Sequence, residues 1–428
     1  MKRLILAIVL ASAPAGAETV LTVDAAMALA REHNRDLAAA RAHLDATQAA
    51  VDQARAALLP TLAAQGRFTH NNKQVGIDLG ALGIGHSVVI QKSEQLDGSL
   101  NASVPIVVPS AYYQLSSARS AQRANQANYV ANEAGVLYAV AQAYYAAVGM
   151  DELVRARQAA VSVASETLDV AKARVAARVA NRVDATRAET ALVRAEQDLA
   201  EANNTQAQAY RALATLIGTQ PELVLKSDAE LPPEPPGLEA LVTQAQNQRA
   251  ELRAEREQHE AYGAAQTAAA LRWAPTLSGF ASGHIYNYAG FSGDKYAWAA
   301  GLQLDWLLFD GGVRDADRSR AEANGREVEW HLAQLGASVT DEVANARGTL
   351  STKRKAVQAA ERAVTLARDT LNLVRAQYGA GSALELDVLG AQDSLVSAEV
   401  GLAQAHFDVE LADLALRRAV GALPGKAR

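Results

Sequence analysis

The sequence predicts a mainly α-helical chain with a small β part, built from tandem-duplicated long coiled-coil helical hairpins and four β-strands. Three observations indicate this fold class. The two halves of the 428-residue chain repeat one another, long proline-free stretches carry apolar residues every seventh position, and four short segments alternate apolar with polar residues. A seven-residue period is typical of coiled coils, whereas a two-residue period is typical of strands. Any function must therefore be one that two similar halves build together.

The duplication sets the domain organisation. Residues 60–62 and 275–277 both read Pro-Thr-Leu, which corresponds to a shift of 215 residues, and later parts match at a shift of 203, which lays Leu192 on Leu395. The expected parts are a signal peptide over 1–17, a first repeat over 18–222, a Pro-rich linker over 223–237 and a second repeat over 238–428.

The first residues have the pattern of a secretory signal peptide. Lys2 and Arg3 precede an apolar run over 4–10, and an Ala-x-Ala cleavage site ends at Ala17. We therefore expect the mature chain to begin at Glu18 and to lie outside the cytoplasm. The net charge of −6 gives no support to nucleic-acid binding, and the lack of cysteine excludes disulfides and thiolate metal sites. No later apolar run is long enough for a transmembrane helix.

Long helices are expected because proline is absent between Ser110 and Gln220 and between Thr276 and Leu423. A helix of roughly 70 residues, from about 110 to 179, would be on the order of 100 Å long. Apolar residues at successive heptads predict a coiled-coil seam on the last helix. These residues are Val388, Leu395, Leu402, Val409 and Leu416. An isolated structural coiled coil would explain this pattern on its own.

Two turns divide the helices into hairpins with tips near 180 and 380. Gly379 and Gly381 suit a left-handed helix end, and the Ser-Ala-Leu-Glu run over 382–385 predicts a capping box that starts the next helix. In the first half, Asn181 is the expected N-cap, with Asp184 three residues later.

Four segments of about ten residues have one apolar and one polar face, which is typical of tilted barrel strands between lipid and water. Gly-rich or polar loops over 73–94 and 287–295 would connect each pair on the outside. The expected strand pairs are about 61–70 with 95–107, and about 276–287 with 296–309.

Three aromatic residues lie on one face of the last segment. Tyr296 and Trp298 lie near one end and Trp306 lies near the other. Strand aromatics more often pack in a soluble core, but this spacing favours two membrane-interface belts. Four strands cannot close a barrel with an aqueous lumen, and an open edge cannot lie in lipid, so we expect subunits to share one barrel. Long helices that continue from such strands would extend the barrel as a helical tube, so we expect a conduit.

The chain resembles the TolC-like outer membrane efflux protein family over essentially all of 18–421. The resemblance rests on the strand entries "LLPTL" and "WAPTL", on the run Trp-Leu-Leu-Phe-Asp-Gly-Gly over 306–312 with Arg314, and on the second tip, "AQYGAGSALELDVLGAQDSLVSAEVGLAQA". It implies a homotrimer with a twelve-stranded outer membrane β-barrel and a periplasmic tunnel of twelve helices. It also implies docking to a periplasmic adaptor (membrane fusion) protein and an inner membrane pump of RND or ABC type.

Asp387 matches the family position whose carboxylates ring the closed periplasmic entrance. The alternative is an acid that the helix dipole favours near a helix N-terminus, by about 0.3 to 1 kcal/mol. Gly390 stands where the family often has a second acid, so one charged ring is expected in place of two.

Tyr378 and Asp184 match a family pair that holds the closed state. A hydrogen bond from a phenol to a carboxylate contributes about 1.5 to 3 kcal/mol, which would bias the entrance towards closure. Tyr378 could instead fill the seam layer after Leu371. The nearby basic latch of the family falls on Ala383, so we expect a more weakly held entrance.

The hairpin tips are the expected adaptor contact, although turn geometry alone could explain their residues. These residues are Val179, Asn181, Gly379, Gly381 and Ser382. The histidines have no paired-ligand spacing and the glycines over 80–85 lack a Walker lysine, so neither an enzyme nor a cofactor is expected. The predicted function is a trimeric outer membrane exit duct for efflux or type I secretion. The rival is a non-conducting periplasmic coiled-coil protein, and the sequence names no cargo.

Overall fold

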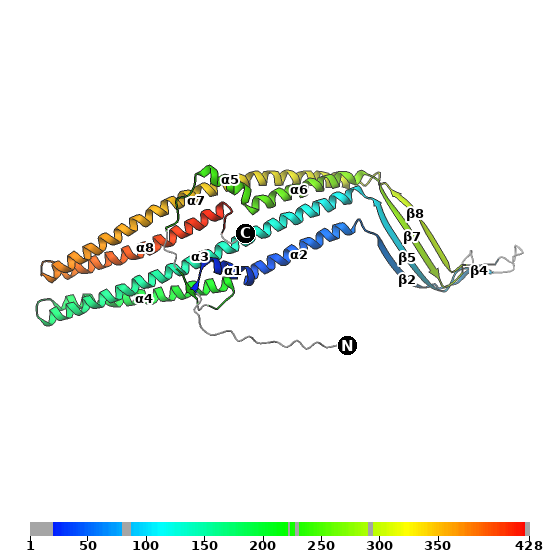
Figure 1. Cartoon of the computed structure of the whole chain (residues 1–428). Helices are drawn as coiled ribbons and strands as arrows, with labels where there is room; N and C mark the ends of the chain where they lie inside the picture. The colour runs from blue at the N-terminus through cyan, green and yellow to red at the C-terminus, as the bar shows by residue number, and fades with distance from the viewer. Residues whose placement is uncertain (1–19, 79–86, 221–222, 227–230, 290–293, 424–428) are drawn as a thin grey trace. The chain divides into compact units, whose positions relative to one another are not determined.

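The computed structural model describes residues 20–78, 87–220, 223–226, 231–289 and 294–423. The expected signal peptide lies outside these residues, as do parts of both expected outer loops. Most of the described chain is helical, and the strands are few (Figure 1). Among the described residues, no helix combines the length and the apolar character needed to cross a membrane.

Each repeat contributes two short helices, two long strands and two long helices. The first contains α1 (Val23–His33), α2 (Arg35–Ala56), β2 (Thr61–His70), β5 (Glu94–Val107), α3 (Pro109–Ala176) and α4 (Arg182–Ile217). The second contains α5 (Leu238–Gln248), α6 (Ala250–Ala270), the 3-10 turn η2 (Leu271–Trp273), β7 (Thr276–Tyr286), β8 (Tyr296–Asp305), α7 (Val313–Gly379) and α8 (Glu385–Ala419). The described residues also contain four short strands: β1 (Val20–Leu21), β3 (Val75–Asp78), β4 (Ser87–Gln91) and β6 (Val224–Leu225).

The chain folds into two compact units, and each unit draws on both repeats. The hairpin unit comprises Met1–Ala39, Asn132–Arg249 and Ser338–Arg428, whereas the sheet unit comprises Ala40–Ala131 and Ala250–Ala337. The duplicated halves are therefore not separate compact bodies.

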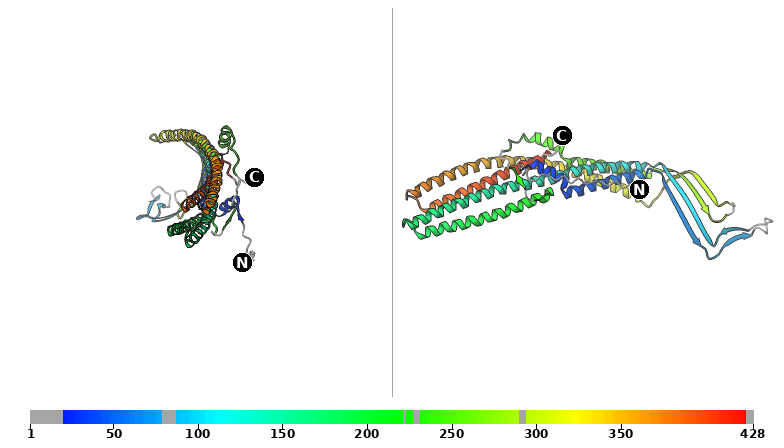
Figure 2. Two further views of the ribbon diagram at one scale, coloured as in Figure 1. Left: turned by 90° about the vertical axis from the view of Figure 1, so that its left-hand side faces the viewer. Right: turned by 60° about the horizontal axis from the view of Figure 1, so that its bottom comes forward.

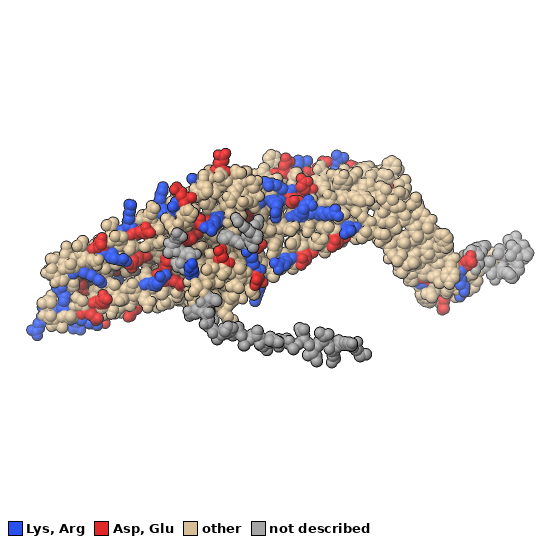
Figure 3. Space-filling model, viewed as in Figure 1, with Lys and Arg blue, Asp and Glu red and all other residues tan. Residues whose placement is uncertain are grey.

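The four long strands of the sheet unit form an antiparallel sheet with the strand order β2-β5-β7-β8 (Figures 1 and 2). The two repeats meet at its centre, where Ala102 of β5 pairs with Ala281 of β7. Because side chains alternate, the register gathers most of the large apolar residues of the four strands on one face, whereas Phe280 lies on the other. The apolar face is exposed: Trp298 is 83% exposed, and the side of the sheet seen in Figure 3 is almost free of charged residues.

Two expected strand features differ from the structure. The last strand ends at Asp305, earlier than the expected 309, because the Asp310 carboxylate accepts hydrogen bonds from the backbone of Gly312 and Arg314 and turns the chain. Gly311 and Gly312 both have positive φ, which supports this turn. The expected loop over 73–94 contains an antiparallel pair of its own, β3 with β4.

The hairpin unit buries three of the five expected heptad residues of α8, and the other two, Leu395 and Leu402, are half-buried. Val388, Val409 and Leu416 are buried on α8, and Leu371 and Ala391 pack together close to the second tip. A larger core surrounds Tyr144, whose hydroxyl donates to the carbonyl of Leu21 on β1 and lies 2.8 Å from that of Lys226 after β6. Both long hairpins are therefore packed structures and not isolated rods.

Candidate functional site

The predicted functional residues of the helices lie at the two tips of the hairpin unit. At the first tip α3 ends at Ala176, and Arg178 adopts a left-handed conformation with φ of 60°. The backbone N–H of Val179 then donates to the carbonyl of Arg174 over 3.0 Å. This pattern closes the end of a helix, and it leaves the Val179 side chain 65% exposed.

The second tip repeats this turn. Gly381 has φ of 78°, and both the N–H and the hydroxyl of Ser382 donate to the carbonyl of Gln377, over 2.9 and 3.1 Å. Ser382 therefore closes the turn after α7, whose last residue is Gly379. The expected capping box over 382–385 is wrong, because the chain is still closing the preceding helix at Ser382. The N-cap is Leu384, whose N–H donates to the Asp387 carboxylate over 2.9 Å.

Asp387 and Asp184 have the same local role. Asp184 accepts from the N–H of the N-cap Asn181 over 3.1 Å, as Asp387 accepts from that of Leu384. The expected Asn181 cap is thus confirmed. Each acid lies in the first turn of its helix, where the helix dipole favours a negative charge. Asp387 is also exposed, so its side chain is accessible for the predicted entrance ring.

Arg174 joins the two hairpins just behind the tips. Its guanidinium lies 4.2 Å from the centre of the Tyr378 ring, and its Nη1 donates to the Tyr378 carbonyl over 2.9 Å. Within the described residues, no hydrogen bond joins the Tyr378 hydroxyl to Asp184. Burial raises the pKa of Tyr378; Arg174 opposes this shift, while Glu385 and Asp184 add to it. Tyr378 and Asp184 thus belong to one electrostatic cluster, and the predicted latch stays a prediction.

Glu385 also belongs to this cluster, although the sequence predicted for it only a role in a capping box. It is 5% exposed, and neither carboxylate oxygen has a hydrogen-bonding partner by distance and angle. Burial, followed by the negative charge of Asp184, raises the pKa of Glu385 to about 7. Arg187 and Arg174 attract the ionised form and limit the shift. Close to neutral pH a large part of Glu385 is therefore uncharged.

The predicted interface aromatics lie at the last strand of the sheet unit. Tyr296 and Trp298 are on β8, whereas Trp306 follows its end and is 61% exposed. The indole N–H of Trp306 donates to the carbonyl of Trp273 over 3.2 Å. The exposure of all three suits contact with lipid head groups, and their role stays a prediction.

The exit from β8 is fixed by a buried cation. Arg314 is 2% exposed, donates to the Asp310 carboxylate over 2.8 Å, and its guanidinium lies 3.9 Å from the centre of the Trp273 ring. The sequence motif contained Arg314 and Asp310, but it gave no sign that Trp273, at the entry of β7, completes the cluster. This cluster ties the entry of one strand to the exit of the next.

Comparison with known proteins supports a single family. The model of the family described as "Outer membrane efflux protein" matches residues 9–219 and 241–422. The chain is 26% identical over 409 residues to outer membrane protein TolC of Vibrio cholerae, covering 92% of this chain and 89% of that protein. It is 24% identical over 415 residues to TolC of Escherichia coli, covering 92% and 81%.

Solved structures show the same fold. The outer membrane protein VceC of Vibrio cholerae superposes with a TM-score of 0.78 at 21% identity, covering 94% of this chain and 96% of that one. CusC superposes with a TM-score of 0.80 at 19% identity, covering 93% and 92%. The chain therefore belongs to the outer membrane efflux protein family, whose members are outer membrane channels with a long periplasmic tunnel.

Proposed function

We propose that three copies of this chain form the outer membrane exit duct of a tripartite efflux or type I secretion system. One observation carries the proposal. The four-stranded sheet exposes an apolar face, and among the described strands the outer edges of β2 and β8 have no partner strand. Unpaired backbone groups are costly in lipid. Pairing β8 of one copy with β2 of the next, three times, would close a twelve-stranded barrel.

The chain order supports a conduit. The helix α2 leads into β2, and α6 leads through η2 into β7. The helix α3 follows β5 almost directly, and α7 follows β8 after the turn at Asp310. Each strand of the barrel would thus continue into a helix on its periplasmic side. Transport through such a duct would be passive, and membership in a family of channels supports this. The energy would come from an inner membrane pump of RND or ABC type.

The tips would control the periplasmic entrance. In this proposal Asp387 lines the constriction, and Tyr378 with Asp184 biases the closed state through the cluster that includes Arg174 and Glu385. An adaptor protein would dock on the exposed turns. The docking residues are Val179, Asn181, Gly379, Gly381 and Ser382.

Planar bilayer recording tests the proposal. Purified protein should insert from detergent and give discrete, low conductance steps. The Tyr378→Phe, Asp184→Ala double variant should give a larger conductance, because it removes a hydroxyl and a charge from the closing cluster. Equal conductance of the wild type and the double variant would reject only the latch. If neither protein gave any conductance, the duct itself would be rejected.

A further inference from the structure

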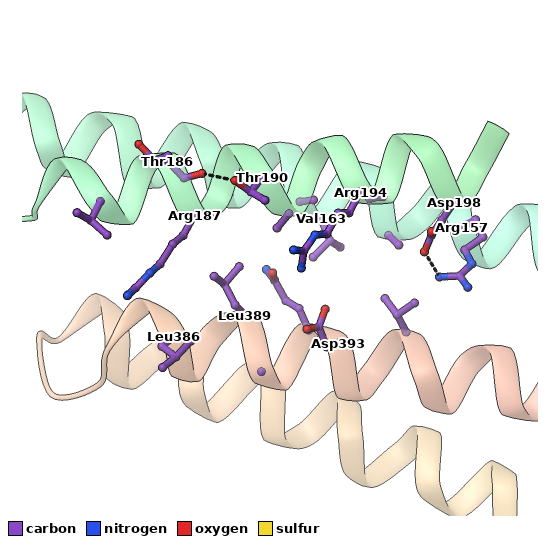
Figure 4. A pocket seen from close by; sticks show the side chains of 18 of the residues that line it. Arg157, Val163, Thr186, Arg187, Thr190, Arg194, Asp198, Leu386, Leu389 and Asp393 are labelled. Carbon is purple, nitrogen blue, oxygen red and sulfur yellow. Dashed lines mark hydrogen bonds and ion pairs between the residues drawn. The ribbon is translucent and has the colours of Figure 1, made fainter. Parts of the chain in front are cut away.

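The polar face of the sheet has a feature to which no role has been given, at the end where β2 and β7 finish. A groove of about 1020 Å³ between α3, α4 and α8 is larger, and Arg157 pairs with Asp198 at its edge (Figure 4). That groove adjoins the turns to which docking is already assigned, so it adds no separate site. The polar face of the sheet is independent of the tips.

Three aromatic side chains follow one another on β7 and just beyond its end. The rings of His284 and Tyr286 are nearly parallel, with an interplanar angle of 7° and 6.1 Å between their centres. Tyr288 continues the row, and its ring centre lies 6.0 Å from that of Tyr286. The side-chain amide of Gln95 on β5 donates to the Tyr288 hydroxyl over 2.8 Å, which holds the last ring in place. We call His284, Tyr286 and Tyr288 the aromatic column.

The aromatic column lies on the opposite face of the sheet from the exposed apolar residues. His284 and Tyr286 flank Ile285, which pairs with Tyr296 of β8 on the apolar face. Because side chains alternate along a strand, His284 and Tyr286 point to the other side. In the proposed barrel the apolar face meets lipid, so the aromatic column of each copy faces the lumen.

The rings of the aromatic column keep part of their faces open. Carbon atoms in contact are about 3.5 to 4.0 Å apart, so parallel rings with centres 6.1 Å apart cannot fully cover each other. The cross-strand neighbours of His284 are Ser99 and Ala297, which are too small to fill the space beside its ring. All three column side chains are only half-buried. The column therefore offers aromatic surface on which another flat ring can stack.

Asp97 places a negative charge beside the aromatic column. It pairs with Tyr286 across β5 and β7, and its Oδ1 is buried without a hydrogen-bonding partner. Arg67 lies opposite Asp97 on β2, but among the described residues no ion pair joins the two side chains. The faces of aromatic rings also attract cations. Both features favour a ligand that is flat and positively charged.

We propose that the aromatic column and Asp97 form a stacking site for planar aromatic cations in the outer part of the lumen. The proposal rests on the duct function, because only a duct brings cargo past this face, and it assigns that cargo a chemical class. Stacking and cation–π attraction depend on a flat shape and a positive charge and not on particular substituents. The site would therefore accept many molecules of this class.

Ethidium, a fluorescent planar cation, tests the site on the purified full-length protein in detergent. Fluorescence anisotropy, corrected with empty micelles, should show binding at least about tenfold tighter than that of pyrene sulfonate, a planar anion. Tyr286→Leu should lose about fivefold or more of the ethidium affinity because it removes a ring, whereas Tyr286→Phe should bind as the wild type does. The same loss in both variants, or no preference for ethidium in the wild type, would overturn the proposal.

Two further variants separate charge and position. Asp97→Asn keeps the size of the side chain and removes its charge, so the preference for ethidium over pyrene sulfonate should fall about threefold or more. Tyr296→Leu is the position control, because Tyr296 is an exposed aromatic at the same end of the sheet on the opposite face. It should bind ethidium as the wild type does. An unchanged preference in Asp97→Asn, or the same loss in Tyr296→Leu as in Tyr286→Leu, would overturn the proposal.

Planar bilayer recording distinguishes failure of this site from failure of the duct. Ethidium should lower the conductance of the wild type, and it should do so less in Tyr286→Leu. A wild type that conducts but neither binds ethidium nor responds to it would overturn the stacking site and leave the duct intact. Absence of conductance would reject the duct, and with it the place of the aromatic column in a lumen.

Discussion

The two hairpin tips are copies of one turn with different surroundings. At the shift of 203 residues Arg178 corresponds to Gly381, and both adopt the left-handed conformation. At the same shift Asp184 corresponds to Asp387, and both accept from the backbone N–H of their N-cap residue. The duplication has therefore preserved the backbone hydrogen bonds of the turn although most side chains differ.

The environment of the second tip has diverged. Glu385 corresponds to Arg182 in the first repeat, so one position carries opposite charges. Arg182 is exposed, whereas Glu385 is buried close to Asp184 and Arg174 of the other hairpin. The comparison teaches that capping depends on local backbone geometry, which a repeat retains. Contact between hairpins depends on single side chains, which a repeat can exchange.

Exchanging the two charges should have the largest effect. Glu385→Arg would bury a cation beside Arg174 and Arg187, and we expect a loss of about 3 to 5 kcal/mol from the contact between hairpins. Arg182→Glu changes an exposed side chain and should stay within about 0.5 kcal/mol. Hydrogen exchange of the backbone amides in both tips would measure each change. Equal effects of the two variants would contradict the asymmetry of the tips.

The pH dependence of the tip contact should follow Glu385. Its pKa is raised from 4.5 to about 7 in the folded chain. Its contribution to stability is therefore fully present below about pH 4.5 and is lost as the pH rises through 7. Glu385→Gln keeps the neutral form, so its thermal stability relative to the wild type should rise between pH 5 and 8. A difference that does not vary with pH would show that Glu385 does not titrate in this range.

The two capping acids should be separable by the same pH titration. Asp184→Ala and Asp387→Ala each remove a cap and should each cost about 1 kcal/mol. Only Asp184→Ala should also lower the pKa of Glu385, because only Asp184 contributes to its shift. Thermal unfolding of Asp184→Ala should therefore vary less with pH than that of Asp387→Ala. The same pH profile for both variants would place the two acids in equivalent surroundings.

The left-handed positions should give the smallest effects. Gly381→Ala should destabilise its tip by about 1 kcal/mol, because a Cβ atom disfavours positive φ. Arg178→Gly should relieve the same strain in the first tip and stabilise it by less than about 1 kcal/mol. Local hydrogen exchange at 174–181 and 377–384 would report both. Stabilisation by Gly381→Ala would show that the turn tolerates other conformations.

The fold was largely predictable because the sequence patterns that indicate it extend over many residues. Heptads over many turns and the absence of proline predicted the hairpins, and alternation over ten residues predicted the sheet. Short-range detail was less accessible. Ser382 and Glu385 matched a capping box, but shifting Asn181 by 203 residues falls on Leu384, which is the cap that the structure has. The leucine side chain has no oxygen that could accept a capping hydrogen bond, so there was no sign of an N-cap at Leu384 in the sequence.

The candidate site was predictable only in part. Tyr378, Asp184 and Asp387 were predicted by resemblance to a family, and their roles stay predictions. Arg174 and Glu385 were not predicted, because their importance comes from burial between two hairpins that lie about 200 residues apart in sequence. Trp273 was missed for the same reason, since cation–π contact with Arg314 joins two separate strand ends. Sequence patterns describe one element at a time, whereas these contacts join two.

Crosslinking across the sheet edges tests most directly whether copies of this chain share one barrel. Cysteine would replace Ala63 on β2 together with Ala297, Ala299 or Gly301 on β8, in a chain that has no cysteine of its own. One of the three double variants should form a covalent trimer on mild oxidation in membranes, because disulfides need closely paired backbones. Each single variant should remain monomeric on a denaturing gel. Monomer from every double variant would contradict the account.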